Sequence, residues 1–132
     1  MKKILLGTLL FKIVSFAIQY VSHFIVNVNH YAKVTFIKKE IVFELGFLTM
    51  ILQGMVLSYF FNLYAKNEYS IRKGLTFGLL MTYLLVSYTA FAEPAKYNVP
   101  SVMAWILTEG IVGIIQFSVY GIGLSLVYKK LK

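Results

Sequence analysis

Four long apolar stretches divide this chain, and they constrain its fold more than any other feature. They cover roughly residues 4–26, 41–64, 74–93 and 102–128. A helix of about 20 residues crosses the ~30 Å hydrocarbon core of a bilayer, so each stretch is long enough to span it. Apolar residues run continuously and do not alternate, which argues against transmembrane strands. The sequence therefore predicts an all-α integral membrane protein, with residues 1–132 forming a single transmembrane domain.

The composition supports a membrane protein and excludes several other classes. Hydrophobic residues make up 59% of the chain and charged residues only 14%, well below the share in soluble domains. The absence of cysteine excludes disulfides and thiolate metal sites. The net charge of +8 is spread between the apolar stretches and does not form one basic surface. We therefore expect the lipid bilayer as a partner and no nucleic acid.

The distribution of basic residues predicts the orientation of the four spans. In an antiparallel up-down four-helix bundle, both termini lie on the same side of the membrane. Nine basic residues then fall on the side of the termini, namely Lys2, Lys3, Lys12, Lys66, Arg72, Lys73, Lys129, Lys130 and Lys132. Four fall on the other side, namely Lys33, Lys38, Lys39 and Lys96. This bias predicts a multi-pass protein of the cell's inner membrane with both termini cytoplasmic.

The connections predict which spans are neighbours. The short inner turn over residues 65–73 makes spans two and three antiparallel neighbours. Pro94 is expected to end span three at Glu93, because a residue before proline disfavours helix. Ser101 is expected to cap the start of span four. Since the loop between Glu93 and Ser101 is short, spans three and four should also lie side by side.

The few acids point to a candidate site. The chain has five carboxylates, and threading it through a bilayer places four of them at the outer face, together with both histidines. These residues are Glu40, Glu44, Glu93, Glu109, His23 and His30. Ionisable groups at membrane depth cost several kcal/mol each, so they mark a functional-site hypothesis.

Two polar stripes predict how spans one and four meet. On span four, the residues on one helix face are Glu109, Gly113, Gln116 and Tyr120. On span one, the residues on one face are Lys12, Ser15, Gln19 and His23. Gln19 should lie at the depth of Glu109, and Lys12 at that of Gln116. If the two spans face each other, they build one polar seam, which we define as Lys12, Gln19, His23, Glu109 and Gln116.

Small residues predict further helix contacts. Gly74 and Gly78 form a GxxxG pair, which is typical of closely packed membrane helices. The face of Gly46, Thr49 and Gln53 on span two is also expected to pack against a helix.

A metal site is the main chemical alternative. Carboxylate and imidazole ligands suit zinc, manganese or non-haem iron. The lesser candidates for such ligands are His23, Glu44, Glu93 and Glu109. The chain lacks the Glu-x-x-His pair of di-iron bundles, so no metal is assigned and no cofactor is clearly encoded.

Three segments carry a resemblance to known proteins: KGLTFG at 73–78, EPAKYNVPS at 93–101 and EGIVGIIQ at 109–116. In these segments the chain resembles uncharacterised families of small bacterial four-helix integral membrane proteins. The resemblance implies a four-helix inner-membrane fold and supplies no activity.

Three functional hypotheses remain open from the sequence. In the first, a carboxylate-containing seam open toward the outer face binds or transports a cation, a proton or a small polar ligand. Its ligand-binding residues would be Glu109, Gln116, Gln19, His23, Lys12, Glu44 and Glu93. The second is a membrane-embedded metal protein or enzyme that uses Glu and His groups. The third is a structural or accessory subunit. Transport would require a homo-oligomer, because four helices leave little room for a path.

Overall fold

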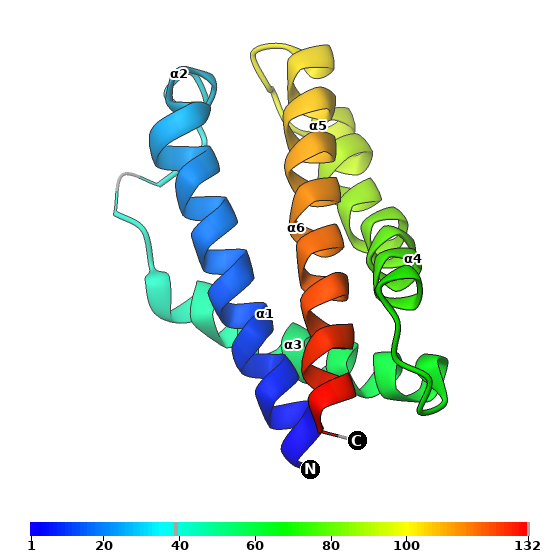
Figure 1. The fold of residues 1–132 in the computed structure, drawn as a ribbon. Helices are drawn as coiled ribbons and strands as arrows, with labels where there is room; N and C mark the ends of the chain where they lie inside the picture. Colours follow the sequence, from blue (N-terminus) through cyan, green and yellow to red (C-terminus); the bar gives the residue numbers. More distant parts are fainter. Residues whose placement is uncertain (39, 132) are drawn as a thin grey trace.

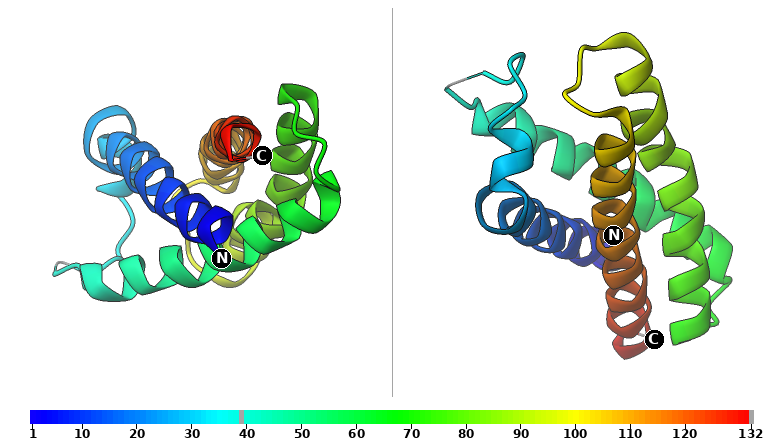
Figure 2. Two further views of the ribbon diagram at one scale, coloured as in Figure 1. Left: turned by 60° about the horizontal axis from the view of Figure 1, so that its bottom comes forward. Right: turned by 90° about the horizontal axis from the view of Figure 1, so that it is seen from above.

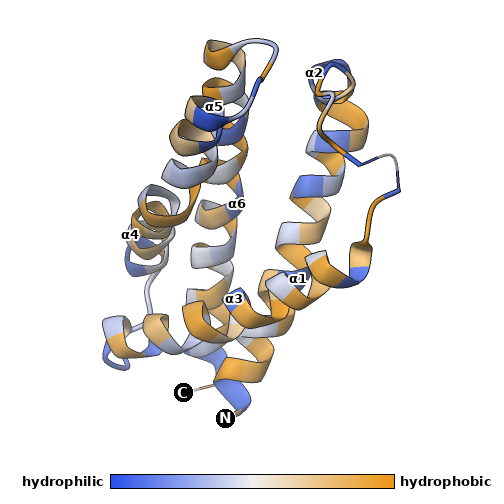
Figure 3. Ribbon diagram, turned by 180° about the vertical axis from the view of Figure 1, so that it is seen from behind, coloured by the Kyte–Doolittle hydropathy of each residue, from blue (hydrophilic) through white to orange (hydrophobic). Residues whose placement is uncertain are grey.

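The computed structural model describes residues 1–38 and 40–131, with 82% helix and no strand in this part of the chain. Four helices are long and apolar enough to cross a membrane, namely Lys2–Val26, Phe43–Ala65, Ile71–Lys96 and Val102–Lys130. Hydrophobic residues dominate the lengths of these helices, and hydrophilic residues gather at the loops and ends (Figure 3). The predictions of an all-α fold and of four candidate spans are therefore confirmed.

Two of the four long helices are built from more than one element, and two are single α-helices. The first helix joins α1 (Lys2–Val21) to η1 (Ser22–Val26), and the third joins α4 (Ile71–Met81), η2 (Thr82–Val86), η3 (Tyr88–Ala92) and α5 (Glu93–Lys96). The second is α3 (Phe43–Ala65), and the fourth is α6 (Val102–Lys130). A short helix, α2 (Val28–Tyr31), follows η1. Both termini lie at one end of the molecule, and α2 and α5 lie at the opposite end, which we call the distal end (Figure 1).

Of the two helix ends predicted from the sequence, one is confirmed and the other is wrong. The Ser101 side chain accepts a hydrogen bond from the backbone N–H of Ala104 at 3.3 Å, so the predicted cap of α6 is confirmed. The prediction that Pro94 ends the third helix at Glu93 is wrong, because the helix continues to Lys96. Pro94 lies inside this continuous helix, at the junction where the π-helical segment η3 passes into α5.

Helices α4 and α6 pack side by side through glycines, as predicted. A Cβ atom at Gly78 would collide with the carbonyl oxygen of Phe117. Gly74 and Gly121 oppose each other in the same way, since a Cβ on either would collide with the other's carbonyl. The GxxxG pair therefore marks a close helix contact within one chain.

Helix α3 departs from the predicted up-down bundle. Figure 1 shows α1, α6 and the rod from α4 to α5 running along one direction, while α3 crosses behind them, and Figure 2 agrees. At the crossing, Gly54 lies against Thr8 and Phe11 of α1. Helices α3 and α4 meet near their connecting turn, where the rings of Phe61 and Phe77 lie 5.2 Å apart. Beyond the turn they diverge, so the prediction that they are neighbours along their length is wrong.

The buried core lies toward the end with the termini. Tyr120 and Tyr128 of α6 are fully buried there, together with Phe61 of α3. The hydroxyl groups of Tyr120 and Ser58 lie 3.0 Å apart, and the Tyr128 hydroxyl donates to the Ser58 carbonyl at 3.0 Å. These bonds satisfy polar groups that would otherwise be costly in an apolar interior. The tight core fixes one end of the molecule and leaves the polar groups of the distal end in a more open setting.

Candidate functional site: the polar seam and its carboxylate

Helices α1 and α6 meet through a chain of amide hydrogen bonds. Gln19 Nε2 donates to Gln116 Oε1 at 2.6 Å, and Gln116 Nε2 donates to Ser15 Oγ at 3.0 Å. Gln116 is 7% exposed and Ser15 is 2% exposed, so both lie in the interior. The predicted contact between spans one and four is confirmed, and polar side chains make it.

Glu109 lies on α6 between this amide chain and the distal end. Its Oε1 accepts a hydrogen bond from the hydroxyl of Tyr31 at 2.7 Å. Tyr31 is the last residue of α2, so the segment that contains α2 folds back onto the seam. Burial raises the pKa of the Tyr31 phenol well above its usual value, and the bond and negative charge of Glu109 raise it further. Tyr31 therefore remains a protonated donor to the carboxylate at neutral pH.

The two histidines surround this pair. The ring of His23 stacks on that of Tyr31, with centroids 3.8 Å apart and planes 11° from parallel. His30 meets the other rings of the cluster, 5.0 Å from Tyr31 and 5.6 Å from Trp105. His30 Nε2 is buried and has no hydrogen-bond partner among the described residues. An unpaired buried nitrogen is unfavourable, so a hydrogen bond from a water or a ligand atom at this nitrogen would stabilise the cluster.

A second carboxylate lies near Glu109. Glu93, at the start of α5, is half-buried; the negative charge of Glu109 acts on it, and its own charge acts on Tyr31. Lys96, one turn further on, attracts Glu93, but its Nζ donates to the hydroxyl of Tyr88 at 2.7 Å. The distal end therefore brings together two carboxylates without a lysine or arginine bonded to either of them in the described chain.

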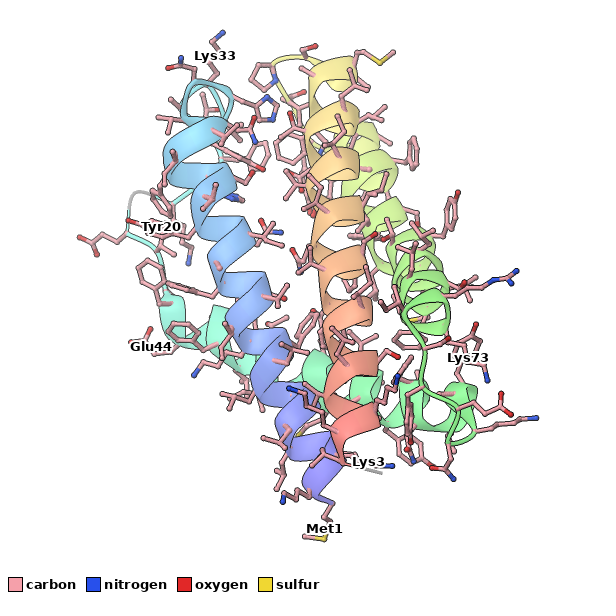
Figure 4. All side chains as sticks on the ribbon, viewed as in Figure 1. Met1, Lys3, Tyr20, Lys33, Glu44 and Lys73 are labelled. Carbon is pink, nitrogen blue, oxygen red and sulfur yellow. The ribbon has the colours of Figure 1, made fainter. Side chains whose placement is uncertain are left out.

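Two of the predicted site residues lie elsewhere. Lys12 points toward α3, where its Nζ lies 4.8 Å from the centre of the Phe47 ring, so it does not face Gln116. Glu44 is exposed at the start of α3, and Figure 4 shows it far from Lys33 at the distal end. The crossing of α3 causes both differences. The fold therefore does not place Glu44 beside Glu93 and Glu109, and Glu93 and Glu109 are the pair that it brings together.

The structure does not bring the candidate metal ligands together in the part of the chain that it describes. No three His, Asp or Glu side chains in residues 1–38 and 40–131 are placed to hold a metal ion. Figure 4 shows Glu44 at the start of α3, away from Lys33 at the distal end.

Three features of the site were not predicted from the sequence. Two are aromatic side chains: Tyr31 bonds Glu109, and Trp105 Nε1 donates to the Thr89 carbonyl at 2.9 Å. The third is the set of π-helical segments η1, η2 and η3, which lie beside or below the distal end. Such segments frequently occur at functional sites. A conspicuous signal was present only for Trp105, the single tryptophan of the chain.

Comparisons with known proteins do not identify a relative. No protein-family model, curated protein or solved structure matches the chain.

Proposed function

We propose that this chain is a membrane protein that binds a cation at Glu109, either a proton or the cationic group of a small polar ligand. One observation carries the proposal. Glu109 lies within a candidate span, and the one hydrogen bond that it accepts from the described residues comes from the neutral Tyr31. No lysine or arginine in the described residues lies within ion-pair distance of it. A carboxylate in hydrocarbon without a counter-charge is unfavourable, and a bound cation or proton removes the unfavourable charge.

The amide hydrogen bonds between α1 and α6 support a binding role for the same region. They form a polar path from the interior toward Glu109, made by Gln19, Gln116 and Ser15. The unpaired Nε2 of His30 adds a further polar atom near Tyr31. A structural subunit would need the amide pair for helix association, but it would not need an uncompensated acid or an unpaired imidazole. These two groups favour ligand binding over a purely structural role.

The membrane arrangement is also part of the proposal. The nine-to-four basic bias favours cytoplasmic termini, with the distal end and Glu109 toward the outer face of an inner membrane. Because aromatic rings pack closely around Tyr31, we propose binding as the basic activity. Transport would need a homo-oligomer that supplies a path.

The first prediction tests Glu109 directly. Protein in lipid nanodiscs should be stabilised against heat by ammonium or ethanolammonium chloride at constant ionic strength, or should show a protonated-carboxyl infrared band between about pH 5 and 9. Glu109→Gln should remove the stabilisation or the band. A ligand at a hundred times its Kd stabilises by about 2.7 kcal/mol.

Glu40→Gln is the matched control, because Glu40 is an exposed carboxylate outside the four candidate spans. It should behave like the wild type. The proposal fails if Glu109→Gln folds normally and changes neither the cation-dependent stability nor the infrared band.

A further inference from the structure

A groove runs beside the seam, between α1 and the start of α3. Its volume is about 420 Å³, which lies within the range of small-molecule pockets. Its walls are largely apolar, with Phe16 and Tyr20 of α1 facing Ile41, Phe43 and Phe47. Gly46 also lines it, and a Cβ atom there would meet nothing within 4 Å. The predicted helix packing at Gly46 is therefore not made within the chain, and the groove is open at this point.

Two polar residues line the groove, Gln19 and His23, and each offers a hydrogen-bond acceptor. Gln19 uses its amide nitrogen to bond Gln116, while its Oε1 has no partner in the described chain. His23 Nδ1 lies 3.0 Å from the Gln19 carbonyl, which can only accept, so Nδ1 carries the hydrogen. Neutral His23 therefore presents Nε2 as an acceptor, also without a partner among the described residues. A ligand that matches this groove carries hydrogen-bond donors at one end of an apolar body.

The groove is connected to the carboxylate. His23 stacks on Tyr31, and Tyr31 donates to Glu109. Gln19 belongs to both the groove and the amide seam. A positively charged donor at Gln19 and His23 would therefore lie beside the part of the seam that holds the uncompensated acid. A primary ammonium group has three N–H donors and the required charge.

We infer that the groove holds a membrane lipid with a primary ammonium headgroup, whose ammonium bonds Gln19 and His23 and whose chain lies along Phe16, Phe43 and Phe47. This inference rests on the proposed cation-binding function and names its ligand class. An apolar groove on a candidate membrane protein is reached sideways from the bilayer, where such amphiphiles are concentrated. The apolar walls exclude water from the headgroup bonds, which strengthens them.

Photo-crosslinking tests this assignment. The protein is placed in phosphatidylcholine vesicles that contain traces of phosphatidylethanolamine or phosphatidylcholine, each with a diazirine in its acyl chain. The ethanolamine probe should be captured several-fold more than the choline probe, whose trimethylammonium has no N–H donor. Labelled peptides should come from the α1 and α3 walls of the groove. Gly46→Leu should reduce capture of the ethanolamine probe several-fold, because the new side chain occupies the groove.

Gly110→Leu is the matched control. Gly110 also has open space where a Cβ would lie, but it lines a different groove, against Tyr83 and Phe91. This variant should retain the wild-type capture, and a milder Gly46→Ala variant should lie between the two. Equal capture of both probes, or capture unaffected by Gly46→Leu in a protein of unchanged helix content, overturns the lipid assignment.

The Glu109→Gln experiment separates the two proposals. Cation-dependent stability that requires Glu109, without headgroup preference in the groove, overturns the lipid site alone. If the wild type shows no cation or proton effect, or if Glu109→Gln leaves that effect unchanged, the proposed function is overturned, and the lipid assignment that rests on it falls too.

Discussion

At the residue scale, Tyr31 decides how the distal end is held. It is the link between the end loop and the interior acid, since it donates to Glu109 and stacks against His23. A carboxylate accepts stronger hydrogen bonds than a neutral oxygen does, so this contact orders α2 over the seam. The same contact ties the position of the loop to the charge of Glu109.

The second prediction concerns the pH dependence of stability at Tyr31. Its folded-state pKa is raised from 10.0, so its contribution is complete below about pH 10 and is lost as the pH rises toward the folded value. The reason is that the unfolded phenol releases its proton first, and the unfolded state then gains relative to the folded one. The wild type should therefore lose stability above about pH 10 more steeply than Tyr31→Phe, by up to one proton in the slope.

Unfolding in detergent at pH 8 to 11 measures this slope. Tyr97→Phe is the control, because Tyr97 lies outside the four candidate spans and is half exposed, so losing its hydroxyl should change the slope less than Tyr31→Phe does. Equal slopes for Tyr31→Phe and the wild type would show that the phenol is not held at Glu109.

The site residues differ in how far the sequence could predict them. Gln19 and Gln116 were predictable, because helical periodicity places each on the polar face of its helix, and two polar faces in hydrocarbon tend to meet. Tyr31 was not predictable, because it lies in a loop whose path depends on tertiary contacts. The predicted positions of Lys12 and Glu44 were wrong for one reason, because both assumed that all four spans are upright.

At the element scale, glycines set the distances between helices. Helices α4 and α6 approach so closely at Gly74, Gly78 and Gly121 that backbone meets backbone. Gly7 of α1 instead lies against side chains, since a Cβ there would collide with Ser58 of α3 and Leu124 of α6. The GxxxG spacing is visible in the sequence and predicts a close helix contact. The helix that each glycine contacts could not be predicted, because the motif indicates a close approach and does not specify the opposing helix.

The third prediction compares two kinds of glycine. Gly78→Ala should destabilise the protein by about 1–3 kcal/mol, because its Cβ meets the Phe117 carbonyl and the helices must separate. Gly110→Ala, on the open side of α6, should instead be neutral or stabilising by up to about 1 kcal/mol, since alanine favours helix. Reversible unfolding in mixed detergent micelles measures both variants. Equal effects at the two positions would contradict the close packing of α4 on α6.

At the scale of the whole molecule, the tilt of α3 takes the start of this helix away from the distal end, where simple threading placed it. The termini lie at one end and the Tyr31–Glu109 site at the other, while α3 crosses between them (Figure 1). Exposed apolar side chains occur on all four long helices, for example Leu5, Leu45, Leu84 and Met103. Such a surface suits lipid, and hydropathy alone predicted it. The crossing of α3 was not predictable, because length and hydropathy report that a helix can span and leave its tilt to packing.

The last prediction uses this crossing to test topology. In the cysteine-free chain, single cysteines can replace Met103, at the distal start of α6, and Glu44, at the start of α3. With cytoplasmic termini, a membrane-impermeant maleimide added to intact cells should label Met103→Cys rapidly. It should label Glu44→Cys slowly, because Figure 4 shows Glu44 away from the distal end. An upright α3 would bring both positions to the outer face, so equal rapid labelling would contradict the crossed arrangement. A reporter fused to the C-terminus completes the test, since activity outside the cell would reverse the proposed orientation.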